Sequence, residues 1–97
     1  MSIDVYPAEQ LKTSYLRRLL DADDAWEEFD LEDTFMDAMI MNYDKENISI
    51  KLNSSGSDEI TLAKSEAVEL QDFALTKIYY KTSEPGKISK VYLLAIR

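Results

Sequence analysis

The chain has 97 residues, of which 45% are hydrophobic, and it carries a formal net charge of −8. This length allows one modest core, so we expect a single domain over residues 1–97. Cysteine and histidine are absent, which excludes disulfides, thiolate sites, the usual general base at neutral pH and most transition-metal sites. These features favour a cytoplasmic protein without a cofactor.

The first predicted element is a helix that begins after Pro7. Proline is tolerated at the first helical position, and Leu11, Tyr15 and Leu19 recur every four residues in "AEQLKTSYLRRLLDA", residues 8–22. This spacing predicts one amphipathic helix.

A second helix is expected to begin at Asp23 or Asp24, both of which are favourable N-cap residues. Continued to Tyr43, it would carry apolar side chains on one broad face and acidic side chains on the other. An alternative ends this helix near Asp30 and makes "FMDAMIMNY", residues 35–43, a strand. The helical periodicity favours the first interpretation.

The second half of the chain changes to a period of two, which is typical of strands. "NISIKL" (47–52) and "ITLAK" (60–64) flank a turn cluster and predict a first hairpin. Residues 72–83 and 87–97 flank a Pro-Gly turn and predict a second hairpin. Between the hairpins, "SEAVELQ" is a short extra strand, a bulged extension or one helical turn.

The last two predicted strands are apolar on both faces, which indicates central strands. If the final strand instead lies at an edge, it is a candidate for pairing with another chain. The expected fold class is α+β, with one or two N-terminal helices packed on a C-terminal antiparallel sheet of four or five strands.

The possible catalytic and metal sites are each incomplete. Asp21, Asp23, Glu27 and Glu32 match four positions of a calcium loop, but Trp26 occupies its obligatory glycine position. Glycine occurs only at positions 56 and 86, so no phosphate-cradling loop can form. Carboxyl pairs could hydrolyse a glycoside, yet so small a chain has little material left to enclose a sugar. We therefore expect neither a metal site nor enzyme activity.

Lysines and tyrosines in the second half resemble a stacking platform for nucleic acid. Their strands contain Lys77, Lys81 and Lys90 near Tyr79, Tyr80 and Tyr92. Because the chain is strongly acidic, a solvated face is the simpler interpretation, and no direct nucleic-acid binding is expected. The N-terminus lacks the features of a signal peptide, and no apolar run reaches the roughly 18 residues of a spanning helix, so no membrane contact is expected.

The acidic residues are concentrated in one part of the chain. Residues 1–45 contain twelve acids and four bases, whereas residues 46–97 contain seven of each. Within "DADDAWEEFDLEDTF" (21–35) there are eight acids and no base. On a helix, Asp30 to Asp37 would span about 10 Å and present a row of carboxylates to a basic protein surface. The candidate partner-binding residues are Trp26, Glu27, Glu28, Asp30, Asp33 and Asp37, with Trp26 as a possible aromatic anchor.

The segments "FDLEDTF" (29–35) and "DEITLAKSEAVELQDFAL" (58–75) resemble, in pattern, small acidic inhibitors such as the uracil-DNA glycosylase inhibitor and the double-stranded-DNA mimics. The order of helices followed by sheet is also similar to that of toxin-immunity proteins. The resemblance implies a non-enzymatic inhibitor that neutralises a basic, nucleic-acid-acting partner. We expect a monomer rather than a dimer.

The sequence leaves three functions open. The first is an immunity protein against a bacterial toxin with nuclease activity. The second is a DNA mimic that blocks a DNA-repair, restriction or CRISPR enzyme. The third, from a different class, is a small adaptor or secretion chaperone that acts through an exposed strand.

Overall fold

The computed structural model describes residues 15–97, and every regular element in this part of the chain is a β-strand. The strands are β1 (Tyr15–Ala22), β2 (Glu27–Phe35), β3 (Asp37–Asn42), β4 (Ile48–Leu52), β5 (Ile60–Leu62), β6 (Ala67–Leu70), β7 (Leu75–Thr82) and β8 (Ser89–Ile96). The predicted α+β class is therefore wrong, because residues 15–97 contain no helix.

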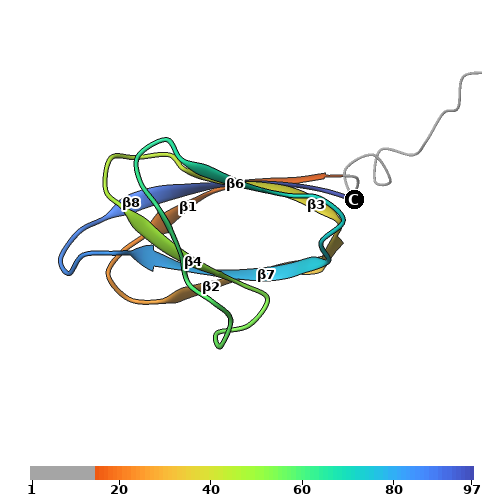
Figure 1. Ribbon diagram of the computed structural model, residues 1–97, viewed down its shortest axis with the longest axis horizontal. Helices are drawn as coiled ribbons and strands as arrows, with labels where there is room; N and C mark the ends of the chain where they lie inside the picture. The colour runs from red at the N-terminus through yellow and green to blue at the C-terminus, as the bar shows by residue number, and fades with distance from the viewer. Residues whose placement is uncertain (1–14) are drawn as a thin grey trace, which may run out of the picture.

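The strands form two antiparallel four-stranded sheets that face each other (Figure 1). Sheet A has the order β1-β8-β3-β6, and sheet B has the order β2-β7-β4-β5. Only β4 and β5 are neighbours both in sequence and within a sheet, because most connections carry the chain from one layer to the other. This arrangement is that of an eight-stranded, double-sheet jelly roll.

The predicted first helix is wrong wherever the structure describes it, and residues 8–14 of that helix lie outside the described residues. Along β1, Leu16 and Leu20 pack against the core, while Tyr15 and Leu19 are exposed. A spacing of four residues fits one face of a helix, but it also fits one face of a strand because four is a multiple of two. The partner strand β8, which pairs with all of β1, decides between the two.

The predicted second helix is also wrong, because its residues form β2 and β3 in different sheets. The chain changes layer at Met36, between the two strands. In β3 the buried positions Ala38, Ile40 and Asn42 alternate with more exposed ones, as expected for a strand. The alternative strand over 35–43 thus agrees with β3, although the helix that it placed before Asp30 does not form.

The second half of the chain confirms some predicted elements and corrects others. β4 and β5 form the first predicted hairpin, with Ile48 opposite Leu62. β6 lies within residues 65–71 and corresponds to the short-strand alternative. The second predicted hairpin is wrong, since β7 and β8 belong to different sheets and each has two other partners. Both strands are central, as their two apolar faces indicated.

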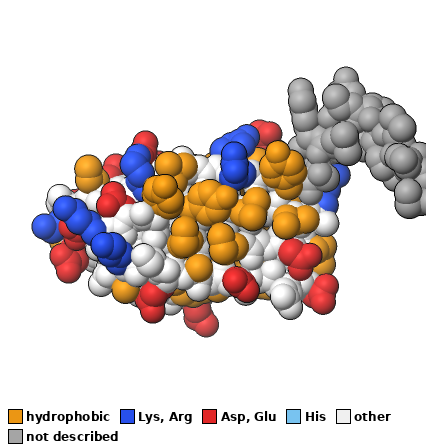
Figure 2. All heavy atoms as spheres, turned by 90° about the horizontal axis from the view of Figure 1, so that it is seen from above, with side chains coloured by type: hydrophobic (Ala, Val, Ile, Leu, Met, Phe, Trp, Pro, Cys, Tyr) orange, Lys and Arg blue, Asp and Glu red, His pale blue; other side chains and the backbone are white. Residues whose placement is uncertain are grey.

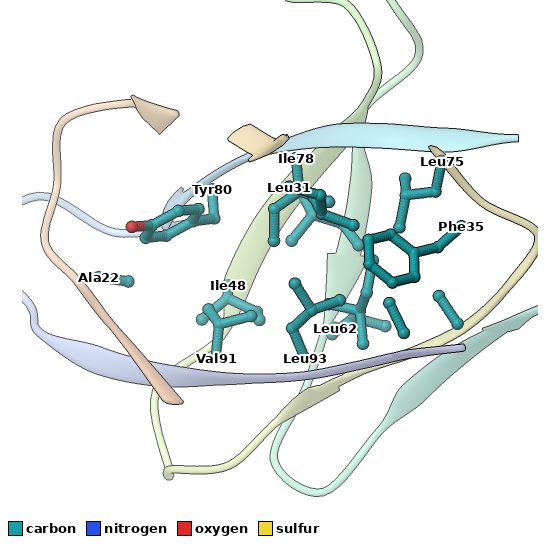
Figure 3. Packing of buried hydrophobic residues seen from close by; sticks show 14 residues of the cluster. Ala22, Leu31, Phe35, Ile48, Leu62, Leu75, Ile78, Tyr80, Val91 and Leu93 are labelled. Atoms are coloured by element: carbon teal, nitrogen blue, oxygen red, sulfur yellow. The ribbon is translucent and has the colours of Figure 1, made fainter. Parts of the chain in front are cut away.

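The core lies between the two sheets and is filled by apolar side chains that both layers contribute (Figure 3). Tyr80, Ile78 and Leu75 come from β7, and Val91 and Leu93 from β8 of the opposite layer. The other buried members are Ala22, Leu31, Phe35, Ala38, Ile40, Ile48, Ile50, Leu62 and Ala95.

A few polar side chains are also buried, and the chain itself satisfies them. The Asn42 Nδ2 donates to the carbonyl oxygens of Glu46 and Leu62 at 2.7 and 3.0 Å, and its Oδ1 accepts from Ser89 Oγ at 3.3 Å. Thr82 Oγ1 donates to the Lys87 carbonyl oxygen at 2.9 Å. Among the described residues, no buried side-chain nitrogen or oxygen lacks a partner. These groups hold the strands and turns together and leave no unpaired polar atom to receive a ligand.

Candidate interaction surfaces

The space between the sheets, where a jelly roll could enclose a small molecule, is occupied by the protein's own side chains (Figure 3). Ile40, Ile48, Ile50 and Ile78 are fully buried there. Within residues 15–97, no group of three or more acidic side chains is placed to hold a metal ion. The interior residues therefore do not fit a resident metal centre. The described residues also include no helix long and apolar enough to cross a membrane.

The acidic segment forms the end of β1, a turn and the edge strand β2. β2 pairs only with β7, so one side of its backbone is free of strand partners. Charged side chains on such an edge oppose pairing with a strand of another molecule. Some of the acids also stabilise local turns: Asp30 Oδ1 accepts from the Glu32 backbone nitrogen at 2.8 Å, where Glu32 has a φ of 63°.

The predicted row of carboxylates is wrong, because it required a helix. Asp30 lies opposite Lys77 within sheet B, Asp33 forms an ion pair with Arg97, and Asp37 lies in sheet A opposite Ile96. The three side chains therefore do not form one continuous stripe. Whether any of them contacts a partner stays a prediction.

Glu27, Glu28 and Trp26 lie together around a shallow hollow of about 240 Å³ on sheet B, with Lys51, Ser55 and Tyr79. The Trp26 ring is 39% exposed and has two ammonium groups near it, Lys51 Nζ at 4.8 Å and Lys81 Nζ at 5.2 Å from the ring centroid. These are cation–π contacts within the chain. A hydrogen bond with Glu28 and, secondarily, desolvation raise the pKa of Tyr79 above its usual value. Trp26 thus already has partners in its own molecule.

The lysines and tyrosines that resembled a stacking platform are divided between the two outer faces and the core. Lys77, Tyr79 and Lys81 lie on the outer face of sheet B, and Tyr80 points into the core. Lys90 and Tyr92 lie on the outer face of sheet A. The structure therefore does not bring these residues together as one platform.

The outer face of sheet A carries the most extensive group of exposed apolar side chains on the described residues. Figure 2 views this face and shows hydrophobic side chains gathered along its middle. The strand register places them in rows across the sheet: Leu19, Tyr92, Met41 and Ala67 form one row, and Leu94 and Met39 belong to the next. We call this surface the apolar face, which consists of Tyr15, Leu19, Met39, Met41, Tyr43, Ala67, Tyr92, Leu94 and Ile96.

Several members of the apolar face are highly accessible. Tyr15 is 55%, Leu19 50%, Tyr43 59% and Ile96 46% exposed. The Tyr43 and Tyr92 rings lie 6.4 Å apart between centroids, so they form an aromatic pair on the surface. A contiguous apolar patch of this kind marks an interaction surface in soluble proteins. This face does not follow from the sequence alone, although the two-sided apolar character of the last strand was a signal of it.

Comparison with known proteins extends only to the fold. No protein-family model matches the chain, and no curated protein matches it in sequence. A solved structure of a Salmonella typhimurium LT2 protein named for ethanolamine utilization, protein Q, is similar with a TM-score of 0.56 and 11% identity. The match covers 94% of this chain and 64% of that protein, so the chain spans less than two thirds of its length. A cupin-2 domain protein from Shewanella frigidimarina NCIMB 400 matches with a TM-score of 0.47 and 15% identity, over 87% and 72% of the two chains.

These findings correct the predicted function. The immunity-protein and DNA-mimic interpretations depended on N-terminal helices and a helical row of carboxylates, and the described residues form neither. The adaptor interpretation depended on an exposed last strand, but β8 is covered on both sides by β1 and β3. The partner predictions, a basic protein and a monomeric state, stay predictions. Residues 15–97 have a double-sheet jelly-roll architecture, and the similarity to the Salmonella protein is one of fold alone.

Proposed function

We propose that this chain is a non-enzymatic assembly module that buries the apolar face of sheet A against a flat, apolar surface of another folded protein. The observation that carries the proposal is the contrast between the two sides of sheet A. Its inner side fills the core, and its outer side presents nine apolar side chains at the surface, eight of them in register within the four strands. The filled interior supports binding rather than turnover as the activity.

The size of the face is that of a small interface. Its strands have eight, eight, six and four residues, and at about 3.3 Å per residue and about 4.8 Å between strands they cover roughly 400 Å² in projection. Burial of that area on both partners removes about 800 Å² of surface, which lies at the low end for protein interfaces and fits a weak or transient contact. Monomers rarely expose a contiguous apolar patch larger than a few hundred Å² without a function for it.

The acidic side chains of the edge strand β2 are a second argument that contact is made through the apolar face. Because charged side chains on β2 oppose edge-to-edge pairing, they direct association away from the edge of sheet B. The outer face of sheet B is also less suited to an apolar contact, since Lys51, Lys77 and Lys81 project from it.

Site-directed photo-crosslinking in the cells that express the chain tests the proposal. A photo-crosslinking amino acid in place of Leu19 samples the apolar face, and the same amino acid in place of the exposed Thr61 samples the outer face of sheet B. We expect a defined protein adduct from position 19 and none from position 61. Equal labelling from both positions, or no adduct from position 19, would refute the proposal.

A further inference from the structure

We infer that the protein bound to the apolar face is a second copy of this chain, related to the first by a two-fold axis that runs parallel to the strands. The inference rests on the proposed function and names its partner. In this dimer the two A sheets lie face to face, β1 of each copy lies over β6 of the other, and β8 lies over β3.

The first support is the charge pattern of one row across sheet A. The register places Arg17 beside Leu94, Leu94 beside Met39, and Met39 beside Glu69. Arg17 and Glu69 therefore lie at opposite edges of the same row, about 14 Å apart across three strand spacings. Both side chains are exposed, and neither takes part in a salt bridge within residues 15–97.

The two-fold axis converts this pattern into two ion pairs. Rotation about an axis along the strands exchanges the left and right edges of the sheet and keeps each row at its own height. Arg17 of each copy then lies over Glu69 of the other copy. Aligned packing of two sheets within about 30° preserves this correspondence for a row close to the centre of the face.

The apolar rows are complementary under the same rotation. In the row of Leu19, Tyr92, Met41 and Ala67, the aromatic Tyr92 ring meets the Met41 thioether of the other copy, a favourable contact. The large Leu19 meets the small Ala67, so a protruding side chain faces a low point of the opposite surface.

A hollow in sheet A supplies a further match in shape. It has a volume of about 380 Å³, and Asp37, Met39, Glu69, Gln71, Leu94 and Ile96 are among the residues that line it. Tyr15 lies at the same end of the sheet but on the opposite edge, in the row of Ile96 and Asp37. The two-fold rotation carries the exposed Tyr15 ring of the second copy over this hollow, as a buried aromatic anchor.

The distribution of charge favours self-association through this surface. The whole chain has a net charge of −8, so two copies repel each other in most orientations. The outer face of sheet A carries two bases, Arg17 and Lys90, and three acids, Asp21, Asp37 and Glu69. Lys90 and Asp21 are already joined at 2.7 Å. The face is thus close to neutral, and it is there that two acidic molecules meet with little repulsion.

A charge-reversal experiment with Arg17→Glu and Glu69→Arg tests this arrangement by sedimentation velocity at low salt. Each variant alone places two like charges over each other, and we expect its dimer dissociation constant to rise at least about 30-fold. An equimolar mixture of the two variants restores both opposite-charge pairs in a heterodimer, so we expect the dimer, of twice 11.2 kDa, to return. Arg18→Glu is the matched control, since Arg18 is exposed in the same strand but lies outside the row of Glu69.

The outcomes separate this inference from the proposed function. A dimer that neither variant weakens, or a mixture that stays monomeric, would overturn the two-fold arrangement. A monomeric wild-type protein whose position 19 crosslinks to a different protein would overturn self-association and leave the assembly function intact. Circular dichroism of each variant confirms that the fold is retained, as expected for exposed positions.

Discussion

Replacement of the buried Asn42 by alanine is expected to destabilise the fold far more than its position at the end of a strand suggests. Asn42 is 1% exposed, and its amide group connects three parts of the chain. It donates to the Glu46 and Leu62 carbonyl oxygens, and it accepts from Ser89 Oγ and, at 3.2 Å, from the Asp44 backbone nitrogen. Asn42→Ala removes all four hydrogen bonds.

The magnitude follows from the groups that lose their partner. A buried polar group left unpaired costs about 1–3 kcal/mol, and two of the four bonds, those with the Leu62 carbonyl oxygen and with Ser89 Oγ, are buried. With some compensation by water at the other two, we expect a loss of about 3 kcal/mol in the free energy of unfolding. For a domain of this size such a loss lowers the melting temperature by roughly 12–24 °C.

Urea unfolding followed by circular dichroism measures this loss directly. Thr61→Ala is the control, since Thr61 is exposed in an edge strand and its loss should change stability by less than about 0.5 kcal/mol. An Asn42→Ala variant within about 1 kcal/mol of the wild type would show that these hydrogen bonds do not hold the strands together.

Three further predictions concern the core, the tyrosines and the acidic edge. Ile40→Ala should lower the free energy of unfolding by about 2–5 kcal/mol because Ile40 is fully buried, whereas Ile88→Ala, at a position that is 76% exposed, should lower it little. Equal losses in chemical denaturation would contradict the placement of Ile40 in the core. Hydrogen bonding to Glu28 raises the pKa of Tyr79, and burial raises the pKa of Tyr80. Both phenols therefore ionise at a lower pH in the unfolded chain than in the folded one, so the stability that they contribute is complete below pH 10 and decreases as the pH rises further. Tyr80→Phe should weaken this decrease in unfolding experiments. An unchanged pH profile of stability would argue against a raised pKa of Tyr80. Replacement of Glu27 and Glu28 by threonine should increase aggregation measured by light scattering, because β2 then loses charge at a free edge. Replacement of Asp58 and Glu59 by threonine removes the same charge from a loop and should increase aggregation less.

The candidate surface could be predicted from the sequence only in part. Residues 89–96 carry apolar side chains at both odd and even positions, so both faces of β8 are apolar, and the outer one forms the centre of the apolar face. Leu19, Met41 and Ala67 could not be assigned to that face beforehand, because each is brought beside β8 by pairings between segments far apart in sequence. Arg17 and Glu69 could not be recognised as members of one row for the same reason.

The sequence by itself determined that the residues after 46 form strands, that β4 and β5 pair through a local turn, and that β7 and β8 are central. These features depend on local alternation and on turn residues. Only the tertiary structure decided the conformation of residues 15–42, where apolar side chains four residues apart fit a helix and a strand equally well. The pairing of Tyr15 with Ile96, at the two ends of the described chain, is what makes β1 a strand, because its backbone groups bond to a distant segment instead of to their own neighbours.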